Sequence, residues 1–284
     1  MANIRRTLEE DFDLVVFAGG QLLYEPFLIP IEQHMEILNN KNTPVIFNGC
    51  GIGSFTNKYI QERFNKMMQS KIVKSVTVRD YVAEANEKLL GSSPVKAVKT
   101  DDSALWTSKA YQMTEVKASD TIGLGIIFRN NIDFMAKQER LYSQIISQLE
   151  ENGQDWEIFC NGEVIVQEFA YQLVEKNGYS KEKVATRKVR PHELVELIGS
   201  YKAIISFRLH SHIVATSLRV PSIGMTWDKK VNFFFGSFNA EDRCFSVDSN
   251  STEIISKLNE AMGKPLDGEI LNKAECRKLK KRES

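Results

Sequence analysis

The stretch at residues 203–224 constrains the fold more than any other part of the chain. An apolar run over residues 203–207 is typical of a buried strand, and it ends at Arg208 and His210. A helical segment follows, and Pro221 begins another apolar run. Ligands of open α/β sheets gather outside the carboxyl ends of strands, where a helix N-terminus adds unpaired N–H groups. We therefore expect Arg208 and His210 to face an anion.

The first part of the chain alternates short apolar runs with helical patterns. The pattern predicts strands at residues 14–18, 44–48, 75–78 and 95–98, and helices at residues 30–40, 56–71 and 81–90. Strands that alternate with helices in this way favour a parallel sheet. The first run is wholly apolar, which predicts a buried strand.

A polar, weakly periodic segment at residues 108–120 predicts a domain boundary, because the alternation restarts after it. Further strands are predicted at residues 121–128, 156–160, 203–207 and 221–226 and near Val184, and helices at residues 133–150, 164–176, 192–199, 251–262 and 269–281. The fold class is thus α/β, with two Rossmann-like doubly wound domains that face each other across a cleft. We place them at residues 1–115 and 116–265, followed by a helical tail at residues 266–284.

Glycines follow the first two predicted strands. Gly19 and Gly20 end the first, and Gly49, Gly51 and Gly53 end the second. Their spacing, GxGxG, differs from the dinucleotide-binding fingerprint. Both a loop that lets a ligand approach the backbone and a tight turn without a ligand fit this pattern.

Three strand ends in the second half of the chain carry cations, and the predicted sheet brings them to one edge. They are Arg129, Arg208 with His210, and Lys229 with Lys230. Arginine offers a planar fork for carboxylate or phosphate, and lysine a compact charge. Histidine can act as acid or base near neutral pH. Together these residues predict a site for a small, multiply charged anion.

The remaining histidines are expected to be structural. His212 would lie in the first turn of a helix, as a packed or capping residue, and His34 and His192 lie on predicted helical segments. Asp101 and Asp102 lack the further ligands that a metal needs. We therefore expect no metal site.

Composition narrows the classes of partner. Lys plus Arg and Asp plus Glu both number 37, so no overall charge favours nucleic acid. The four cysteines show no CxxC spacing, which indicates free thiols in a reducing compartment. The chain has neither a signal-peptide pattern nor a long apolar run. We expect a cytoplasmic protein with at most peripheral contact with the inner face of the membrane.

A set of short motifs resembles the polysaccharide pyruvyl transferase family in order and spacing, over about residues 13–240. These motifs are Phe17-Ala-Gly19-Gly20, Gly49-x-Gly51-Ile-Gly53, Val78-Arg79-Asp80, Asp102-Ser-Ala104, Arg208-Leu-His210 and Asp228-Lys-Lys230-Val. Family members have two Rossmann-like domains in a GT-B-like arrangement. They also begin with a βα unit upstream of the Gly-Gly motif, so the resemblance implies that the first domain is shortened at its N-terminus.

The resemblance implies a pyruvyl transferase that moves the enolpyruvyl unit of phosphoenolpyruvate onto a sugar of a cell-surface polysaccharide or its precursor, as a pyruvate ketal. No cofactor beyond this co-substrate is implied. His210 would be the catalytic residue, while Arg129, Arg208 and Lys230 or Lys229 would bind phosphoenolpyruvate. On the acceptor side, substrate would be bound by Gly19, Gly20, Gly51, Gly53 and Arg79. The resemblance implies a saccharide acceptor, either free or lipid-linked.

Two other functions fit the same residues. One is a GT-B glycosyltransferase that holds the phosphates of a nucleotide sugar at a helix N-terminus. The other is a catalytically silent member of the family that binds a glycan or another protein. The sequence leaves the oligomeric state, the acceptor sugar and the choice between an acid and a base role for His210 open.

Overall fold

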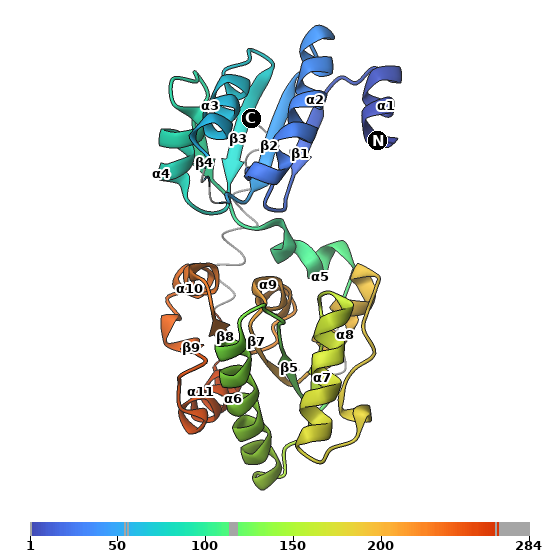
Figure 1. Cartoon of the computed structure of the whole chain (residues 1–284), viewed down its shortest axis with the longest axis vertical. Coiled ribbons are helices and arrows are strands. Elements are labelled where there is room, and N and C mark those ends of the chain that lie inside the picture. The colour runs from blue at the N-terminus through green and yellow to red at the C-terminus, as the bar shows by residue number, and fades with distance from the viewer. Residues whose placement is uncertain (1, 54, 56, 114–118, 265, 267–284) are drawn as a thin grey trace. The chain divides into compact units, whose positions relative to one another are not determined.

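A computed structural model describes residues 2–53, 55, 57–113, 119–264 and 266 of the chain (Figure 1). The chain divides into two compact units, Met1–Ser103 and Ala104–Ser284, called unit 1 and unit 2 below. The predicted helix at residues 269–281 lies outside the described residues.

The division lies about a dozen residues before the predicted boundary at residue 115. Two short helices follow it, η3 (Ser103–Trp106) and α5 (Thr107–Ala110). They belong to unit 2 because Ser217 donates through Oγ to the Leu105 carbonyl, at 2.9 Å, and accepts from the Ser108 N–H, also at 2.9 Å. Residues 104–110 are therefore part of the second unit.

Unit 1 contains a four-stranded parallel sheet in the order β1-β2-β3-β4. The strands are β1 (Val15–Ala18), β2 (Val45–Cys50), β3 (Val73–Val78) and β4 (Ala97–Lys99). The helices are α1 (Ala2–Glu9), η1 (Glu25–Phe27), α2 (Leu28–Asn40), α3 (Lys58–Met68), α4 (Val82–Glu84) and the π-helical turn η2 (Ala85–Leu90). The alternation predicted from the sequence is confirmed.

The core of unit 1 lies on one face of this sheet. Phe47, Val76 and Ala97 are neighbours across β2, β3 and β4, and they pack with buried residues of α2, α3 and η2. β1 is an edge strand, and Val16, on the other face, is 46% exposed. The prediction of a fully buried first strand was therefore wrong, because an apolar run does not reveal how many neighbours a strand has.

Unit 2 contains a five-stranded parallel sheet in the order β6-β5-β7-β8-β9. The strands are β5 (Ile122–Gly125), β6 (Trp156–Phe159), β7 (Ala203–Ser206), β8 (Ser222–Thr226) and β9 (Cys244–Ser246). Val184 extends the sheet beyond β6 by an isolated parallel bridge to Ile158. The predicted short strand near Val184 is thus a single bridge.

Helices cover both faces of the second sheet, as the doubly wound prediction requires. Buried residues of α6, α7 and α11 pack on one face, and those of α8 and α9 on the other. The helices of unit 2 are α6 (Ile132–Glu151), α7 (Val164–Lys176), η4 (Lys181–Lys183), α8 (Pro191–Ser200), α9 (Leu209–Ser217), α10 (Lys229–Gly236), η5 (Glu241–Arg243) and α11 (Ser251–Gly263). None of the described helices is both long and apolar enough to cross a membrane.

The strand order of unit 2 contains a topological switch point between β5 and β7. From β5 the chain proceeds to β6 on one side, and it returns to form β7 on the other side of β5. Connections therefore diverge at the carboxyl ends of these two strands, which is the place where ligands bind in folds of this kind.

Candidate active site

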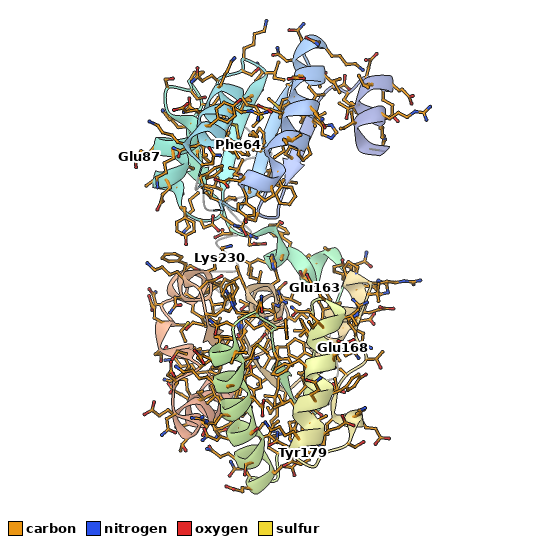
Figure 2. All side chains as sticks on the ribbon, in the orientation of Figure 1. Phe64, Glu87, Glu163, Glu168, Tyr179 and Lys230 are labelled. Carbon is orange, nitrogen blue, oxygen red and sulfur yellow. The ribbon has the colours of Figure 1, made fainter. Side chains whose placement is uncertain are left out.

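The predicted cations of the second half all lie at the carboxyl edge of the unit 2 sheet. Arg129 follows β5, Arg208 and His210 follow β7, and Lys229 and Lys230 follow β8. Because β5 and β7 flank the switch point, Arg129 and Arg208 stand on its two sides. Figure 2 shows Lys230 at this end of unit 2.

Arg129 is held against the loop that follows β8. Its guanidinium carbon lies 4.0 Å from the centre of the Trp227 ring and 5.9 Å from that of Phe134. Its backbone N–H points to the sulfur of Met135, at 3.3 Å. Stacking on an aromatic face keeps the charge of an arginine while it fixes the position of the group. Arg129 therefore joins the ends of β5 and β8.

The two lysines lie in the first turn of α10. Asp228 is the N-cap of this helix, and its Oδ1 accepts from the Lys230 N–H at 2.8 Å. Lys229 is exposed and Lys230 is half-buried. Cations at a helix N-terminus face the positive end of the helix dipole, and the Asp228 carboxylate offsets part of that positive charge. The two lysines leave an excess of positive charge, which favours a ligand with negative charge.

Arg208 reaches in the other direction, toward the end of β6. It is the N-cap of α9, and its guanidinium lies over Gly162, where a Cβ atom would be only 2.6 Å from Nη2. Its Nε is buried and has no hydrogen-bond partner among the described residues. Burial lowers the pKa of Arg208, and the negative charge of Glu163 opposes this effect. Arg208 is thus a partly buried cation with a donor that remains to be satisfied.

The two histidines of the α9 motif have different environments. His210 is the second residue of α9 and its side chain is exposed. His212 is fully buried, and its Nε2 donates to the Ser206 carbonyl at 2.8 Å. Burial lowers the pKa of His212 to about 4, so that its ring is neutral at neutral pH. Of the two, His210 is the one that a ligand can reach.

The glycines predicted to bind substrate lie at the carboxyl edge of the unit 1 sheet, where the chain itself fills the space above two of them. Gly19 and Gly20 have φ angles of +65° and +58°, which favour glycine in the turn after β1. A Cβ at Gly51 would be 2.8 Å from Arg79 Nη2, and one at Gly53 would be 2.2 Å from the Tyr24 ring. A role for these glycines in binding an acceptor stays a prediction.

Arg79 is nearly buried and belongs to an ion-pair network within unit 1. Its guanidinium pairs with the carboxylate of Asp102 and, at 3.7 Å, with that of Asp80. Asp80 also accepts from the Ile52 N–H at 3.0 Å, through Oδ1. The network connects the ends of β2, β3 and β4. Arg79 therefore has a structural role, and its assignment to substrate stays a prediction.

Sequence reasoning missed a polar group after β6. Asn161 donates through Nδ2 to Ser211 Oγ at 2.8 Å, and its Oδ1 is buried without a partner among the described residues. Arg187, which follows the Val184 bridge, reaches the Gly162 carbonyl with Nη1 at 3.5 Å. The Asn-Gly pair directly after a predicted strand is the signal that could have indicated this group.

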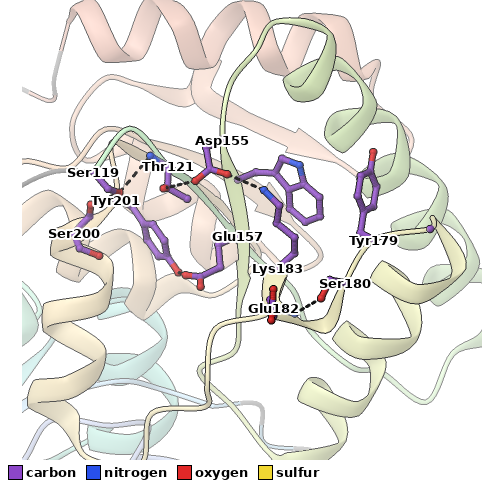
Figure 3. Close-up of a pocket in the computed structure, with 12 residues that line it drawn as sticks. Ser119, Thr121, Asp155, Glu157, Tyr179, Ser180, Glu182, Lys183, Ser200 and Tyr201 are labelled. Carbon is purple, nitrogen blue, oxygen red and sulfur yellow. Dashed lines mark hydrogen bonds and ion pairs between the residues drawn. The ribbon is translucent and has the colours of Figure 1, made fainter.

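A pocket of about 500 Å³ lies at the opposite edge of the unit 2 sheet, near the amino ends of β5 and β6 (Figure 3). Its polar groups satisfy one another. Asp155 pairs with Lys183 at 2.7 Å and accepts from Thr121 at 2.7 Å, and Tyr201 donates to Glu157 at 2.6 Å. These contacts indicate that the polar residues of the pocket stabilise the fold. Among the described residues, no group of three His, Cys, Asp or Glu side chains is placed to hold a metal.

Comparison with solved structures defines the class of fold. A UDP-GlcNAc 2-epimerase from Methanocaldococcus jannaschii has a TM-score of 0.62 and 17% identity, over 94% of this chain and 75% of the epimerase. A UDP-forming α,α-trehalose-phosphate synthase from Burkholderia xenovorans has a TM-score of 0.51 and 10% identity, over 93% and 70%. These enzymes have the GT-B fold, so the two parallel-sheet α/β domains place this chain in the same fold class.

The family model of polysaccharide pyruvyl transferase matches residues 2–229. The chain therefore belongs to the polysaccharide pyruvyl transferase family. The match includes all of unit 1 from residue 2 onward and, in unit 2, the segments that carry Arg129, Arg208 and His210. No curated protein matches the chain by sequence.

Proposed function

We propose that the protein transfers the enolpyruvyl unit of phosphoenolpyruvate to a sugar of a cell-surface polysaccharide or its precursor and forms a pyruvate ketal. The observation that carries this proposal is the Nε of Arg208 at the switch point of unit 2, which is buried without a hydrogen-bond partner among the described residues and lies beside the exposed His210. Phosphoenolpyruvate is a small anion with a carboxylate and a phosphate. Arginine forks suit both groups.

The donor would lie across the carboxyl edge of unit 2. Arg208 and the N-terminus of α9 would bind one of its anionic groups, and Arg129 with Lys230 the other. Lys229 is more exposed than Lys230 and would contribute mainly through its field. These cations would balance the charge of the donor and stabilise the phosphate as it leaves.

His210 would carry the proton transfers. A proton is added to the methylene carbon of the donor, which leaves a cationic centre at the adjacent carbon. One sugar hydroxyl attacks that carbon and loses its proton to a base, after which the C–O bond to phosphate breaks and phosphate leaves. A second hydroxyl then attacks and loses its proton, which closes the ketal. An imidazole at the exposed position of His210 suits either the acid or the base of this sequence.

The proposed binding site for the acceptor is based on the family motifs of unit 1. We assign the saccharide, free or lipid-linked, to the glycine loops after β1 and β2 at Gly19, Gly20, Gly51 and Gly53. The proposal requires no cofactor beyond phosphoenolpyruvate. It is compatible with a cytoplasmic enzyme at the inner face of the membrane.

A second candidate is a glycosyltransferase that uses a nucleotide sugar. It is favoured by the similarity to enzymes whose names include UDP-GlcNAc and UDP. Calorimetric titration of the whole chain with phosphoenolpyruvate and, separately, with UDP-GlcNAc distinguishes the two. We expect binding of phosphoenolpyruvate that Arg208→Gln weakens by about tenfold or more. Binding of the nucleotide sugar alone would favour the second candidate.

A further inference from the structure

A glutamine occupies a core position in the helix that follows β5. Gln138 lies in α6 at helical spacing from Leu141, Tyr142 and Ile145, which are buried in the core of unit 2. The side chain of Gln138 is fully buried as well. A buried amide is costly unless its hydrogen bonds are made, so the contacts of Gln138 indicate its role.

Both ends of the Gln138 amide are bonded to one residue, Ile127. The Oε1 atom accepts from the Ile127 N–H at 3.2 Å, and the Nε2 atom donates to the Ile127 carbonyl at 2.9 Å. Ile127 lies two residues past the last ladder pairs of β5, in which Gly125 is opposite Phe159 and Ser206. The side-chain amide therefore supplies the hydrogen bonds that a neighbouring strand would supply, and it holds the chain beyond the end of β5.

This extension of β5 carries Arg129 to the proposed donor site, two residues after the buried Ile127. The backbone N–H of Arg129 points to the sulfur of Met135, which precedes Gln138 by three residues in α6. The guanidinium forms no ion pair with any of the described residues and lies on the ring of Trp227. The position of Arg129 therefore depends on the backbone that α6 holds.

We propose that Gln138 is a positioning residue of the donor site, which places Arg129 by holding the backbone of Ile127. The inference rests on the proposed function, in which Arg129 binds an anionic group of phosphoenolpyruvate. An apolar side chain of similar size would fill the core but would leave the N–H and the carbonyl of Ile127 buried without these partners. The segment would then shift to satisfy both groups, and the guanidinium would leave the face of Trp227.

Tyr142 offers a matched control, because it also donates from α6 to the backbone of β5. Its buried hydroxyl donates to the Gly125 carbonyl at 2.8 Å. Gly125, however, is held by the ladder on both sides, and its carbonyl also accepts from the Phe207 N–H at 3.3 Å. Tyr142→Phe therefore removes a buried hydrogen bond but should leave the extension of β5 in place.

The fluorescence emission of Trp227 reports the position of Arg129 without any ligand. Arg129→Gln removes the charge from the face of the Trp227 ring and should change this emission. Gln138→Met should reproduce most of the change, and Tyr142→Phe should leave the emission as in wild type. All of these differences should vanish in a Trp227→Phe background. Wild-type emission from a folded Gln138→Met protein would overturn the proposal.

Gln138→Glu provides the test if Gln138→Met does not fold. A protonated carboxyl group can accept from the Ile127 N–H and donate to its carbonyl, whereas an ionised one cannot donate. Burial raises the pKa of a glutamic acid. Measured against wild type at each pH, the emission should match wild type at about pH 6 and approach that of Arg129→Gln by about pH 9.5. Emission that follows wild type across this range would contradict the proposal.

Calorimetric titration with phosphoenolpyruvate tests the link to the donor site. Gln138→Met should weaken binding by about tenfold in the wild-type background but by less than about twofold in the Arg129→Gln background, because a positioning residue acts through the group it places. Equal losses in the two backgrounds would overturn the positioning role. The emission change without phosphoenolpyruvate binding, even by wild type, would support the placement of Arg129 and refute the donor.

Discussion

Arg208 and Gly162 fit together in a way that only a glycine allows. The guanidinium from the end of β7 lies over the backbone after β6, where a Cβ atom would approach Nη2 to 2.6 Å. Arg129 makes the opposite connection, from β5 to Trp227 after β8. The two arginines on either side of the switch point therefore reach in opposite directions.

Gly162→Ala should displace the Arg208 guanidinium without unfolding the protein. The added methyl group meets the far end of a flexible side chain, which can move at little cost. We expect phosphoenolpyruvate affinity to fall by about tenfold, because a misplaced binding group loses much of its effect. Calorimetry measures the affinity, and Gly263→Ala is the control because its Cβ would meet nothing within 4 Å. Equal affinity of Gly162→Ala and wild type would show that the placement of Arg208 is unimportant.

Asp228→Ala should both destabilise α10 and weaken donor binding. The variant loses the hydrogen bond to the Lys230 N–H, and loss of an N-cap costs about 1 kcal/mol. Asp228→Asn keeps an accepting oxygen and should retain most of the stability. Urea unfolding and calorimetric titration of both variants separate the effect of the capping hydrogen bond from the effect of the negative charge. If the two variants behave alike, the capping role is refuted.

The strands of unit 2 could be predicted because they are buried on both faces. Ile204 and Ile205 of β7 are both fully buried, and such continuous apolar runs are visible in a sequence. The positions of the cations at the strand ends could be predicted from the same alternation of strands and helices. The edge position of β1 could not be predicted, since it depends on pairing rather than on composition. The helix α10 was missed, although Asp228 and the spacing of Val231 and Phe235 indicate it.

The sequence could not separate the two arginines that follow β3 and β7. Each comes directly after an apolar run. Arg79 is paired with Asp102, which is distant in the sequence, whereas Arg208 forms no ion pair with any of the described residues. This difference arises from tertiary contacts, and it decides which arginine is available to a ligand.

Arg79→Gln should destabilise unit 1. The change removes the charge that pairs with Asp102 and Asp80, whose side chains are only 12% and 14% exposed. Loss of one partner of a buried ion pair costs about 3 kcal/mol or more. Urea unfolding measures the loss, and Lys74→Gln on the preceding strand β3 is the exposed control. A stable Arg79→Gln protein with weaker binding of the acceptor would instead favour the predicted substrate role.

Protonation of His212 should destabilise the fold in mild acid. Its pKa is about 4 in the folded protein and 6.5 in the reference state, so the unfolded chain binds the proton more readily between these values. Stability is therefore retained above pH 6.5 and lost as the pH falls toward 4. From about pH 7 to about pH 5 the loss is about 2 kcal/mol. Urea unfolding of wild type and His212→Gln should show this component only in wild type.

The most direct test of the account is phosphate release from phosphoenolpyruvate in the presence of a panel of saccharide acceptors. Wild type and the control His192→Gln should release phosphate in a manner that depends on the acceptor. His210→Gln should bind phosphoenolpyruvate normally but release phosphate at least about a hundredfold more slowly, because it lacks the acid or base of the reaction. Near-normal phosphate release by a folded His210→Gln protein would contradict the account.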